Sequence, residues 1–231
     1  MSTDVSESDK ALRLLGPGST QKGRDLRLRD GDILVAVNGI PFSGTEKELS
    51  AKFIDAHGRA LVLTFQRGQQ TLSVLSTSSR IGAWEQISWP DQQVAGKLNP
   101  DILTNWEFFR SSDGIYDLQP LSPGILALIA PPIWLLQMRL WVPGAALIAA
   151  GMVALAVSPL MGLAVYLGAG LHVWHSGPNY FRKDREGRGL MADVVLASPS
   201  EKAAHTAYAR LNPGLRFVFA PEPVPPAAAE G

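Results

Sequence analysis

Residues 124–138 read GILALIAPPIWLLQM, and residues 140–174 read LWVPGAALIAAGMVALAVSPLMGLAVYLGAGLHVW. Both runs belong to a longer stretch, from residue 118 to residue 181, in which Arg139 is the only charged side chain. A run of about 18 or more apolar residues is the usual sign of a membrane-spanning helix. The stretch therefore predicts a membrane region over residues 121–176, with water-soluble segments on both sides.

Prolines divide this predicted region into three apolar pieces. The first, residues 124–138, contains Pro131-Pro132, and Ser158-Pro159 separates the second (142–157) from the third (159–174). A helix of about 16 residues is about 24 Å long, which is less than a hydrocarbon core of about 30 Å. Basic residues stay on the cytoplasmic side of a membrane, and here they flank the pieces at Arg139, Arg182, Lys183, Arg185 and Arg188.

This charge pattern predicts a multi-pass protein with a helical hairpin of two short spans and with both termini cytoplasmic. A re-entrant or interfacial helix precedes the hairpin, because Pro131-Pro132 interrupts the helical hydrogen bonds of the first piece. The alternative is three full spans with the N-terminal module outside.

Composition limits the classes of function. The 231 residues carry 21 basic and 21 acidic side chains, so the basic excess of a general nucleic-acid binder is missing. The chain has no cysteine, which excludes disulfides and thiolate sites. Residues 1–10 are polar and residues 221–231 are rich in Pro and Ala, and both segments are predicted to be disordered. The polar start also lacks the apolar core of a signal peptide.

Residues 11–77 have the pattern of a small α+β module. The apolar run Ile33-Leu34-Val35-Ala36-Val37 predicts a buried strand, and Asn38-Gly39 predicts a tight turn after it. Thr45 and Glu48 have the spacing of a capping box, which places the start of a helix over residues 46–57. Two further strands are predicted over residues 60–66 and 70–75.

This module resembles a PDZ domain of the bacterial type. The resemblance rests on Leu28-x-x-Gly31-Asp32-Ile33-Leu34-Val35-Ala36-Val37-Asn38-Gly39 and on the order of the elements that follow. It implies a groove to which a peptide C-terminus adds as a strand. The peptide-binding residues implied by the resemblance are Leu14, Leu15, Gly16, Leu49 and Phe53. The alternative is a degenerate module that serves as a fixed docking block.

The remaining water-soluble segments are predicted to be small. Residues 78–120 form an aromatic-rich connector, whose Trp84, Trp89 and Trp106 lie along the membrane surface or, alternatively, cover the core of the small domain. Residues 177–220 form a cytoplasmic C-terminal α/β region, with a strand over residues 192–197 and a helix over residues 199–211.

Residues 116–210 resemble a small, uncharacterised bacterial inner-membrane family. The resemblance rests on Pro132-Ile133-Trp134-Leu135-Leu136, on Arg139-Leu140-Trp141 and on Asn179-Tyr180-Phe181-Arg182-Lys183. It implies a location in the bacterial inner membrane, and it implies no activity. The predicted fold class is therefore an α+β PDZ-like module, an α-helical membrane hairpin and a small C-terminal α/β tail.

Small residues mark the predicted contact faces of the hairpin, because they let membrane helices approach closely. They pack the hairpin against itself or form a docking face for other integral membrane proteins, and these readings are compatible. The positions are Gly144, Ala149, Gly151, Gly162, Gly168 and Gly170.

His172 and His175 are the candidates for a metal or haem ligand. They are three residues apart and share one face of the predicted helix. Imidazole ligates metals and porphyrin-type pigments, but His is also common and inert near a polar boundary. No cofactor is predicted.

No nucleophile motif, zinc-protease motif or phosphate loop occurs in the sequence, so the chain is predicted not to be an enzyme. The sequence favours a membrane-anchored adaptor or accessory subunit of a larger inner-membrane complex, of the respiratory or photosynthetic type. Its predicted partners are the lipid bilayer, other integral membrane subunits and a peptide C-terminus, with no nucleic acid. The alternatives are a PDZ-type regulator of a membrane protease or export machine, and a haem or pigment binder that uses His172.

Overall fold

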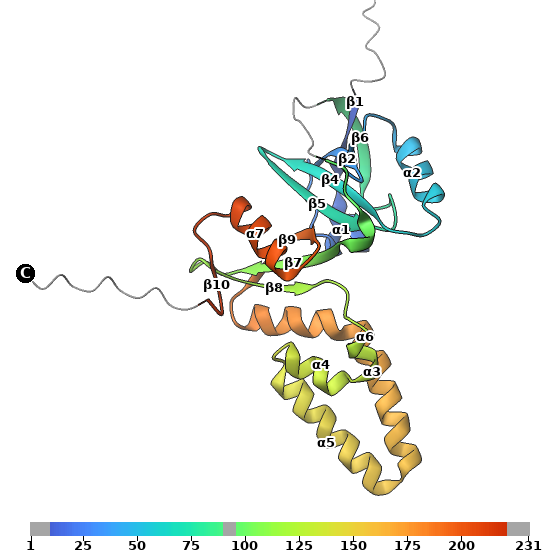
Figure 1. Cartoon of the computed structure of the whole chain (residues 1–231), viewed down its shortest axis with the longest axis vertical. Coiled ribbons are helices and arrows are strands. Elements are labelled where there is room, and N and C mark those ends of the chain that lie inside the picture. The colour runs from blue at the N-terminus through green and yellow to red at the C-terminus, as the bar shows by residue number, and fades with distance from the viewer. Residues whose placement is uncertain (1–9, 90–95, 221–231) are drawn as a thin grey trace, which may run out of the picture.

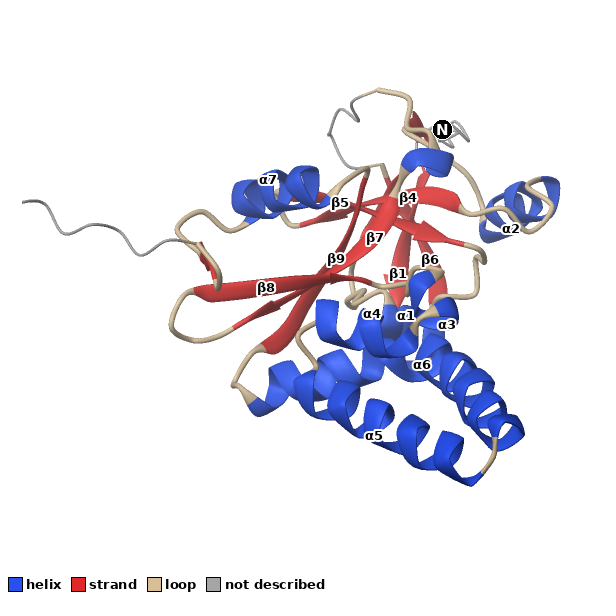
Figure 2. Ribbon diagram, turned by 60° about the horizontal axis from the view of Figure 1, so that its bottom comes forward, coloured by secondary structure: helices blue, strands red, loops and turns tan. Residues whose placement is uncertain are grey.

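The computed structural model describes residues 10–89 and 96–220, and it consists of two β-sheets with a helical hairpin projecting from one end (Figure 1). The segments 1–9 and 221–231, where disorder is predicted, lie outside the described residues. Figure 2 shows the hairpin, built from α5 and α6, leaving the sheets on the side of α3 and α4.

The first sheet contains the predicted N-terminal module and one strand from beyond it. Its strand order is β5-β4-β2-β1-β6, β3 pairs with β2, and every pair is antiparallel. Helices η2 (Pro17–Ser19), α1 (Gln21–Asp25) and α2 (Glu46–Asp55) connect the strands. The strands are β1 (Lys10–Leu15), β2 (Ile33–Val37), β3 (Ile40–Pro41), β4 (Leu61–Arg67), β5 (Gln70–Ser76) and β6 (Ala83–Ser88).

Local signals in the sequence account for the turns of this sheet. Asn38 and Gly39 both have positive φ, 53° and 73°, and they join β2 to β3 as the predicted tight turn. The Asn38 side chain also accepts a hydrogen bond from the Val62 N–H at 2.8 Å. The Thr45–Glu48 capping box at the start of α2 is confirmed in both directions. The predicted strand, turn and helix of this region are thus present.

The second sheet brings together segments that the sequence places far apart. Its order is β10-β8-β7-β9, with β10 parallel to β8 and the other pairs antiparallel. The predicted connector supplies β6, β7 and β8, while the C-terminal region supplies β9, the helix α7 and β10. Helix η3 (Pro100–Ile102) precedes β7 (Thr104–Arg110), and the remaining elements are β8 (Ile115–Pro120), β9 (Met191–Ser198), α7 (Glu201–Leu211) and β10 (Arg216–Phe217).

A single apolar core joins the two sheets. Leu34, Leu63 and Phe65 from the first sheet belong to the same buried cluster as Phe108 and Tyr208 from the second. The Asn105 side chain links the sheets by hydrogen bonds to the Leu75 N–H and C=O groups, both at 2.8 Å. The sheets therefore form one body, from which the hairpin emerges between β8 and β9.

Four helices lie between β8 and β9 in the chain. They are α3 (Leu126–Ile129), α4 (Pro131–Gln137), α5 (Trp141–Val157) and α6 (Pro159–Gly187). The sequence break at Ser158-Pro159 is the tip of the hairpin: Ser158 caps α6 by accepting a hydrogen bond from the Met161 N–H, and Pro159 is the first residue of that helix. The second and third predicted pieces are thus the two arms.

The predicted membrane spans are wrong. Among the helices of the described residues, none combines the length with the apolar content that crossing a membrane requires. Helix α5 has 17 residues and is about 26 Å long. Helix α6 has 29 residues, but it continues past its apolar part into the charged segment from Arg182 to Glu186.

This finding corrects three predictions together. The fold class is α+β with two sheets and a projecting helical hairpin, rather than a module with two short spans and a re-entrant helix. The multi-pass placement in a bacterial inner membrane, with both termini cytoplasmic, falls with the spans. Three full spans, the alternative topology, fall for the same reason.

Candidate functional site

The hairpin is the most unusual surface of the described chain, because large apolar side chains are exposed on both of its arms. Val142 on α5 is 81% exposed and Leu160 on α6 is 77% exposed. Contiguous apolar surface of this kind marks an interaction site in most proteins. The other exposed apolar positions on the arms are Trp141, Ile148, Met152, Val153, Leu155, Val157, Met161, Leu163, Tyr166, Leu167 and Leu171.

Glycines bring the hairpin close to the helices at its base. A Cβ atom added to Gly162 would lie 2.4 Å from the Leu155 side chain, and one added to Gly170 would lie 2.5 Å from the Leu128 carbonyl oxygen. Gly177 faces the Trp134 ring, which an added Cβ would approach to 2.6 Å. These contacts let the arms pack against each other and against α3 and α4.

We expect Gly170→Ala to loosen the hairpin from α3, because its new methyl group meets a backbone carbonyl that cannot move aside as a side chain can. The free energy of unfolding should fall by about 1–3 kcal/mol, the usual cost of overpacking, as measured by urea unfolding. Gly168→Ala is the matched control, since a Cβ there meets nothing within 4 Å. Equal losses in the two variants would contradict the proposed close contact.

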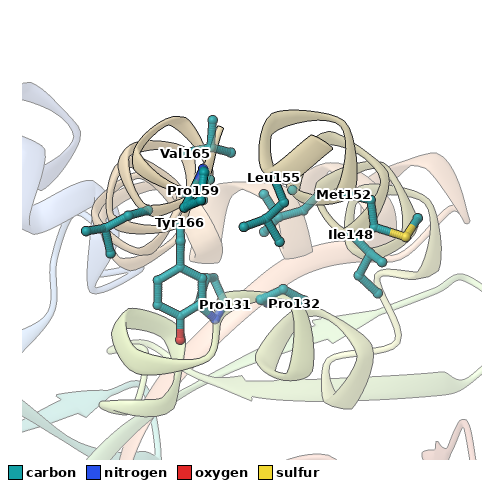
Figure 3. A pocket seen from close by; sticks show the side chains of 13 residues that line it. Pro131, Pro132, Ile148, Met152, Leu155, Pro159, Val165 and Tyr166 are labelled. Atoms are coloured by element: carbon teal, nitrogen blue, oxygen red, sulfur yellow. The ribbon is translucent and has the colours of Figure 1, made fainter. Parts of the chain in front are cut away.

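An apolar cleft of about 520 Å³ lies between the two arms and the start of α4 (Figure 3). Its walls are Ile148, Met152 and Leu155 from α5, with Tyr166 from α6 and the Pro131-Pro132 pair. The Tyr166 hydroxyl donates a hydrogen bond to the Ile129 carbonyl oxygen, so the one hydroxyl among these side chains already has a partner. The cleft therefore offers an almost purely aliphatic environment.

A buried carboxylate ties the base of the hairpin to the body. Glu107 on β7 is fully buried and accepts hydrogen bonds from Arg27 Nε at 2.9 Å and from Arg182 Nε at 2.9 and 3.0 Å. The Gln119 side-chain amide donates a further bond at 3.0 Å. Because Arg182 belongs to α6, this cluster fixes the direction in which the hairpin leaves the sheets.

A second ion pair lies nearby, between Arg185 Nε on α6 and Asp117 Oδ2 on β8, at 2.5 Å. Both side chains are buried. Burial raises the pKa of the Asp117 carboxyl above its ordinary value, while the Arg185 charge and the Leu118 N–H oppose that rise. Arg185 also stacks its guanidinium on the Phe181 ring at 3.9 Å, which keeps the pair at the hairpin base.

The raised pKa of Asp117 makes stability depend on pH in a definite direction. The folded protein holds the Asp117 proton at a pH where the unfolded chain has released it. The contribution of this group to the free energy of unfolding is therefore fully present below the ordinary aspartate pKa and is lost as the pH rises through the raised value. We expect the free energy of unfolding of Asp117→Asn, relative to that of the wild type, to increase as the pH rises above the ordinary aspartate pKa of about 4, measured by urea unfolding at several pH values. A relative loss for the variant with rising pH would show that the Arg185 pair outweighs burial.

The pKa values of two tyrosines in the aromatic cluster of the second sheet are also shifted. Burial, together with the Asp193 carboxylate that accepts the Tyr208 O–H at 2.9 Å, raises the pKa of Tyr208. Burial also raises the pKa of Tyr116. Both hydroxyls stay protonated in the ordinary pH range, so they act as hydrogen-bonding groups of the core.

The structure places the predicted peptide-binding residues on β1, directly after β1 and on α2, and three of them share one buried core cluster. Leu14 and Leu15 lie on β1, which pairs with β2 on one side and β6 on the other, so no further strand can add there. Gly16 follows β1 and has φ of 53°, with its N–H bonded to Asp30 Oδ1 at 2.8 Å. Leu49 and Phe53 on α2 are buried in the core. The two edge strands of the first sheet are β5 and β6, and β6 is the one that lies next to β1.

The predicted packing residues and histidines lie on the hairpin. Gly144, Gly162 and Gly170 are buried at contacts, whereas Ala149 and Gly168 are exposed and Gly151 lines the cleft. His172 Nε2 is 2.7 Å from the Tyr180 hydroxyl, and His175 is exposed. Across residues 10–89 and 96–220, no three His, Asp or Glu side chains are grouped as metal ligands.

Comparisons with protein-family models, with curated proteins and with solved structures gave no match. The resemblances to a PDZ domain and to an uncharacterised membrane family therefore stay predictions. Sequence reasoning missed the Glu107 cluster. The available signal was an acidic residue between Trp106 and Phe108 in a strand, but its partners Arg27 and Arg182 are distant in the chain.

Proposed function

We propose that this chain is a non-catalytic adaptor or accessory subunit that acts by protein–protein contacts within a larger assembly. The observation that carries the proposal is the projecting hairpin, whose arms expose apolar side chains such as Val142 and Leu160 to 81% and 77%. In the adaptor, the hairpin is the attachment element and the two-sheet body is the part presented to other subunits.

The base of the hairpin connects the attachment element rigidly to the two-sheet body. The buried Glu107 and Asp117 carboxylates, on β7 and β8, both pair with arginines of α6. Removing one member of a buried ion pair is costly, because the other charge is left without a partner. The body is thereby held in one orientation relative to whatever covers the hairpin, which is what an adaptor needs.

The test is affinity purification of the tagged full chain in mild detergent, followed by quantification of the proteins recovered with it. An adaptor should recover a protein partner at a fixed molar ratio that does not change with washing. Leu160→Glu should recover the partner at the same ratio as the wild type, because the two-sheet body is presented to other subunits while detergent covers the apolar hairpin. The absence of any partner at fixed ratio would refute the adaptor.

A specific observation also favours a second candidate, a regulator that binds the end of a peptide. The outer edge of β6 is unpaired by any described strand, and a sheet edge accepts an extended peptide through main-chain hydrogen bonds. Ser50 of α2 is hydrogen-bonded to Ser79 at 2.9 Å, which joins the helix to the loop that leads into β6. This candidate moves the predicted binding edge from β1 to β6.

Titration of a peptide library against the full chain tests this second candidate. Binders with a free C-terminal carboxylate should weaken when the carboxylate is amidated. Proline at a β6 position whose N–H points away from β1 should abolish peptide binding, because it removes a hydrogen-bond donor. Proline on the outward-facing edge of β5 is the control for loss of stability. Equal binding of carboxylate and amide peptides would exclude recognition of a C-terminus.

A further inference from the structure

We propose that the hairpin is covered by the hydrocarbon of a single lipid leaflet, which it enters from one side without crossing. The inference rests on the proposed adaptor function and names what its attachment element contacts. The charged base of the hairpin remains at the headgroups, and the two-sheet body stays in water.

The distribution of exposed apolar side chains around each arm favours a fluid apolar phase over a protein face. Successive helical residues point about 100° apart, and Met152, Val153 and Leu155 are 62%, 67% and 59% exposed. On α6, Leu160, Met161 and Leu163 are likewise exposed in different directions. A flat protein partner would cover one side only. A helix that is apolar all round needs an apolar environment all round, and acyl chains provide it.

Charge complementarity points to the same partner. From residue 118 to residue 183 the sequence contains no carboxylate, and its charged residues are Arg139, Arg182 and Lys183. Arg139 is exposed two residues before the start of α5, and Lys183 is exposed on α6 beyond its apolar part. Basic side chains at the base of an apolar element are attracted to anionic headgroups.

The aromatic residues have the placement expected at such a boundary. Trp141 starts α5 and is 63% exposed. Trp174 and Tyr180 are half-buried on the part of α6 that precedes the basic residues, and the Tyr180 hydroxyl is 2.7 Å from His172 Nε2. Tryptophan and tyrosine prefer the membrane–water interface because one end of each ring system is apolar and the other is polar.

The dimensions also fit one leaflet. Half of a bilayer, headgroups included, is about 20 Å thick. The 17 residues of α5 are about 26 Å long, so a tilted hairpin reaches the acyl layer and returns on the side it entered. The cleft of about 520 Å³ between the arms, lined by Ile148, Met152 and Leu155, is open to an acyl chain from that layer.

Flotation of the purified full chain with lipid vesicles tests the proposal. The wild type should float with phosphatidylcholine vesicles, and Leu160→Glu should lower the partition coefficient by about tenfold or more, because a charge then enters the acyl layer. Ile54→Glu is the matched control, since Ile54 is 74% exposed on α2 against 77% for Leu160, and it should float like the wild type. Circular dichroism checks that both variants are folded.

A second flotation experiment tests the basic residues at the base of the hairpin. Adding anionic phosphatidylglycerol to the vesicles should increase wild-type binding. Lys183→Gln should lose about fivefold of binding to these vesicles and nothing on neutral ones. Lys47→Gln, at an exposed position of α2, should bind as the wild type does. Equal effects of the two substitutions would overturn the role of the hairpin base.

The remaining outcomes separate this inference from the adaptor function. A wild type that stays with the unbound protein on both kinds of vesicle overturns lipid insertion. If that protein is also a dimer by light scattering, and Leu160→Glu dissociates it, a second copy covers the hairpin. The adaptor stands or falls separately, on whether a protein partner is recovered at fixed ratio, whatever the vesicles show.

Discussion

Glu107→Leu is expected to cost about 3–5 kcal/mol in the free energy of unfolding. The substitution removes a fully buried carboxylate and leaves the charges of Arg27 and Arg182, whose side chains are 29% and 16% exposed, without their main partner. Three guanidinium hydrogen bonds to Glu107 are lost together. Urea unfolding measures the loss. Hydrogen exchange should show α6 opening earlier than β4, because the cluster joins that helix to the body.

Glu85→Leu provides the matched control for this first prediction. Glu85 pairs with Arg13 at 3.3 Å, but the two side chains are 49% and 42% exposed. An exposed ion pair contributes at most about 1 kcal/mol, so this variant should differ little from the wild type. A second variant, Glu107→Leu with Arg182→Leu, should recover part of the stability, because it removes one of the stranded charges. Similar losses for Glu85→Leu and Glu107→Leu would show that burial does not set the strength of these pairs.

Tyr208→Ala is expected to cost about 3–5 kcal/mol, the usual range for removing a large buried aromatic side chain. The Tyr208 ring is fully buried on α7, stacks on Phe108 with centroids 4.2 Å apart, and lies 4.9 Å from the Tyr116 ring centroid. These contacts hold α7 on the second sheet. The loss is measured by urea unfolding, and the near-ultraviolet circular dichroism signal of the aromatic cluster should weaken at the same time.

Tyr208→Phe separates the hydroxyl of Tyr208 from its ring. The variant keeps the stacking on Phe108 and removes only the hydrogen bond to Asp193, so about 1–2 kcal/mol should be lost. Asp193 keeps its exposed pair with Arg29 at 3.1 Å, which limits the penalty. A loss for the phenylalanine variant as large as that for alanine would mean that the hydrogen bond, and not packing, holds α7.

The residues that make up the hairpin could be predicted from the sequence, but their contacts with the rest of the protein could not. The apolar run, its break at Ser158-Pro159 and its small residues are visible in the sequence, and the structure turns them into the hairpin and its tip. The contacts of Gly170 with Leu128 and of Gly177 with Trp134 depend on how α3 and α4 fold back on α6. Apolar periodicity carries no information about such a return, so the length of the run suggested spans.

The sequence by itself determined the local elements of this protein: the strand β2, the turn at Asn38-Gly39, the capped start of α2 and the apolar arms of the hairpin. Each of these depends on residues a few positions apart, whose φ preferences, capping groups or apolar spacing act locally. Only the tertiary structure decided that β6 lies at the sheet edge beside β1, that β7 pairs with β9, and that Glu107 meets Arg27 and Arg182. These contacts join residues as far apart in the chain as Thr104 and Ser198. They form because burying the shared core and pairing its charges stabilises the whole body. That stabilisation depends on residues distant in the chain, so no short stretch of sequence predicts it.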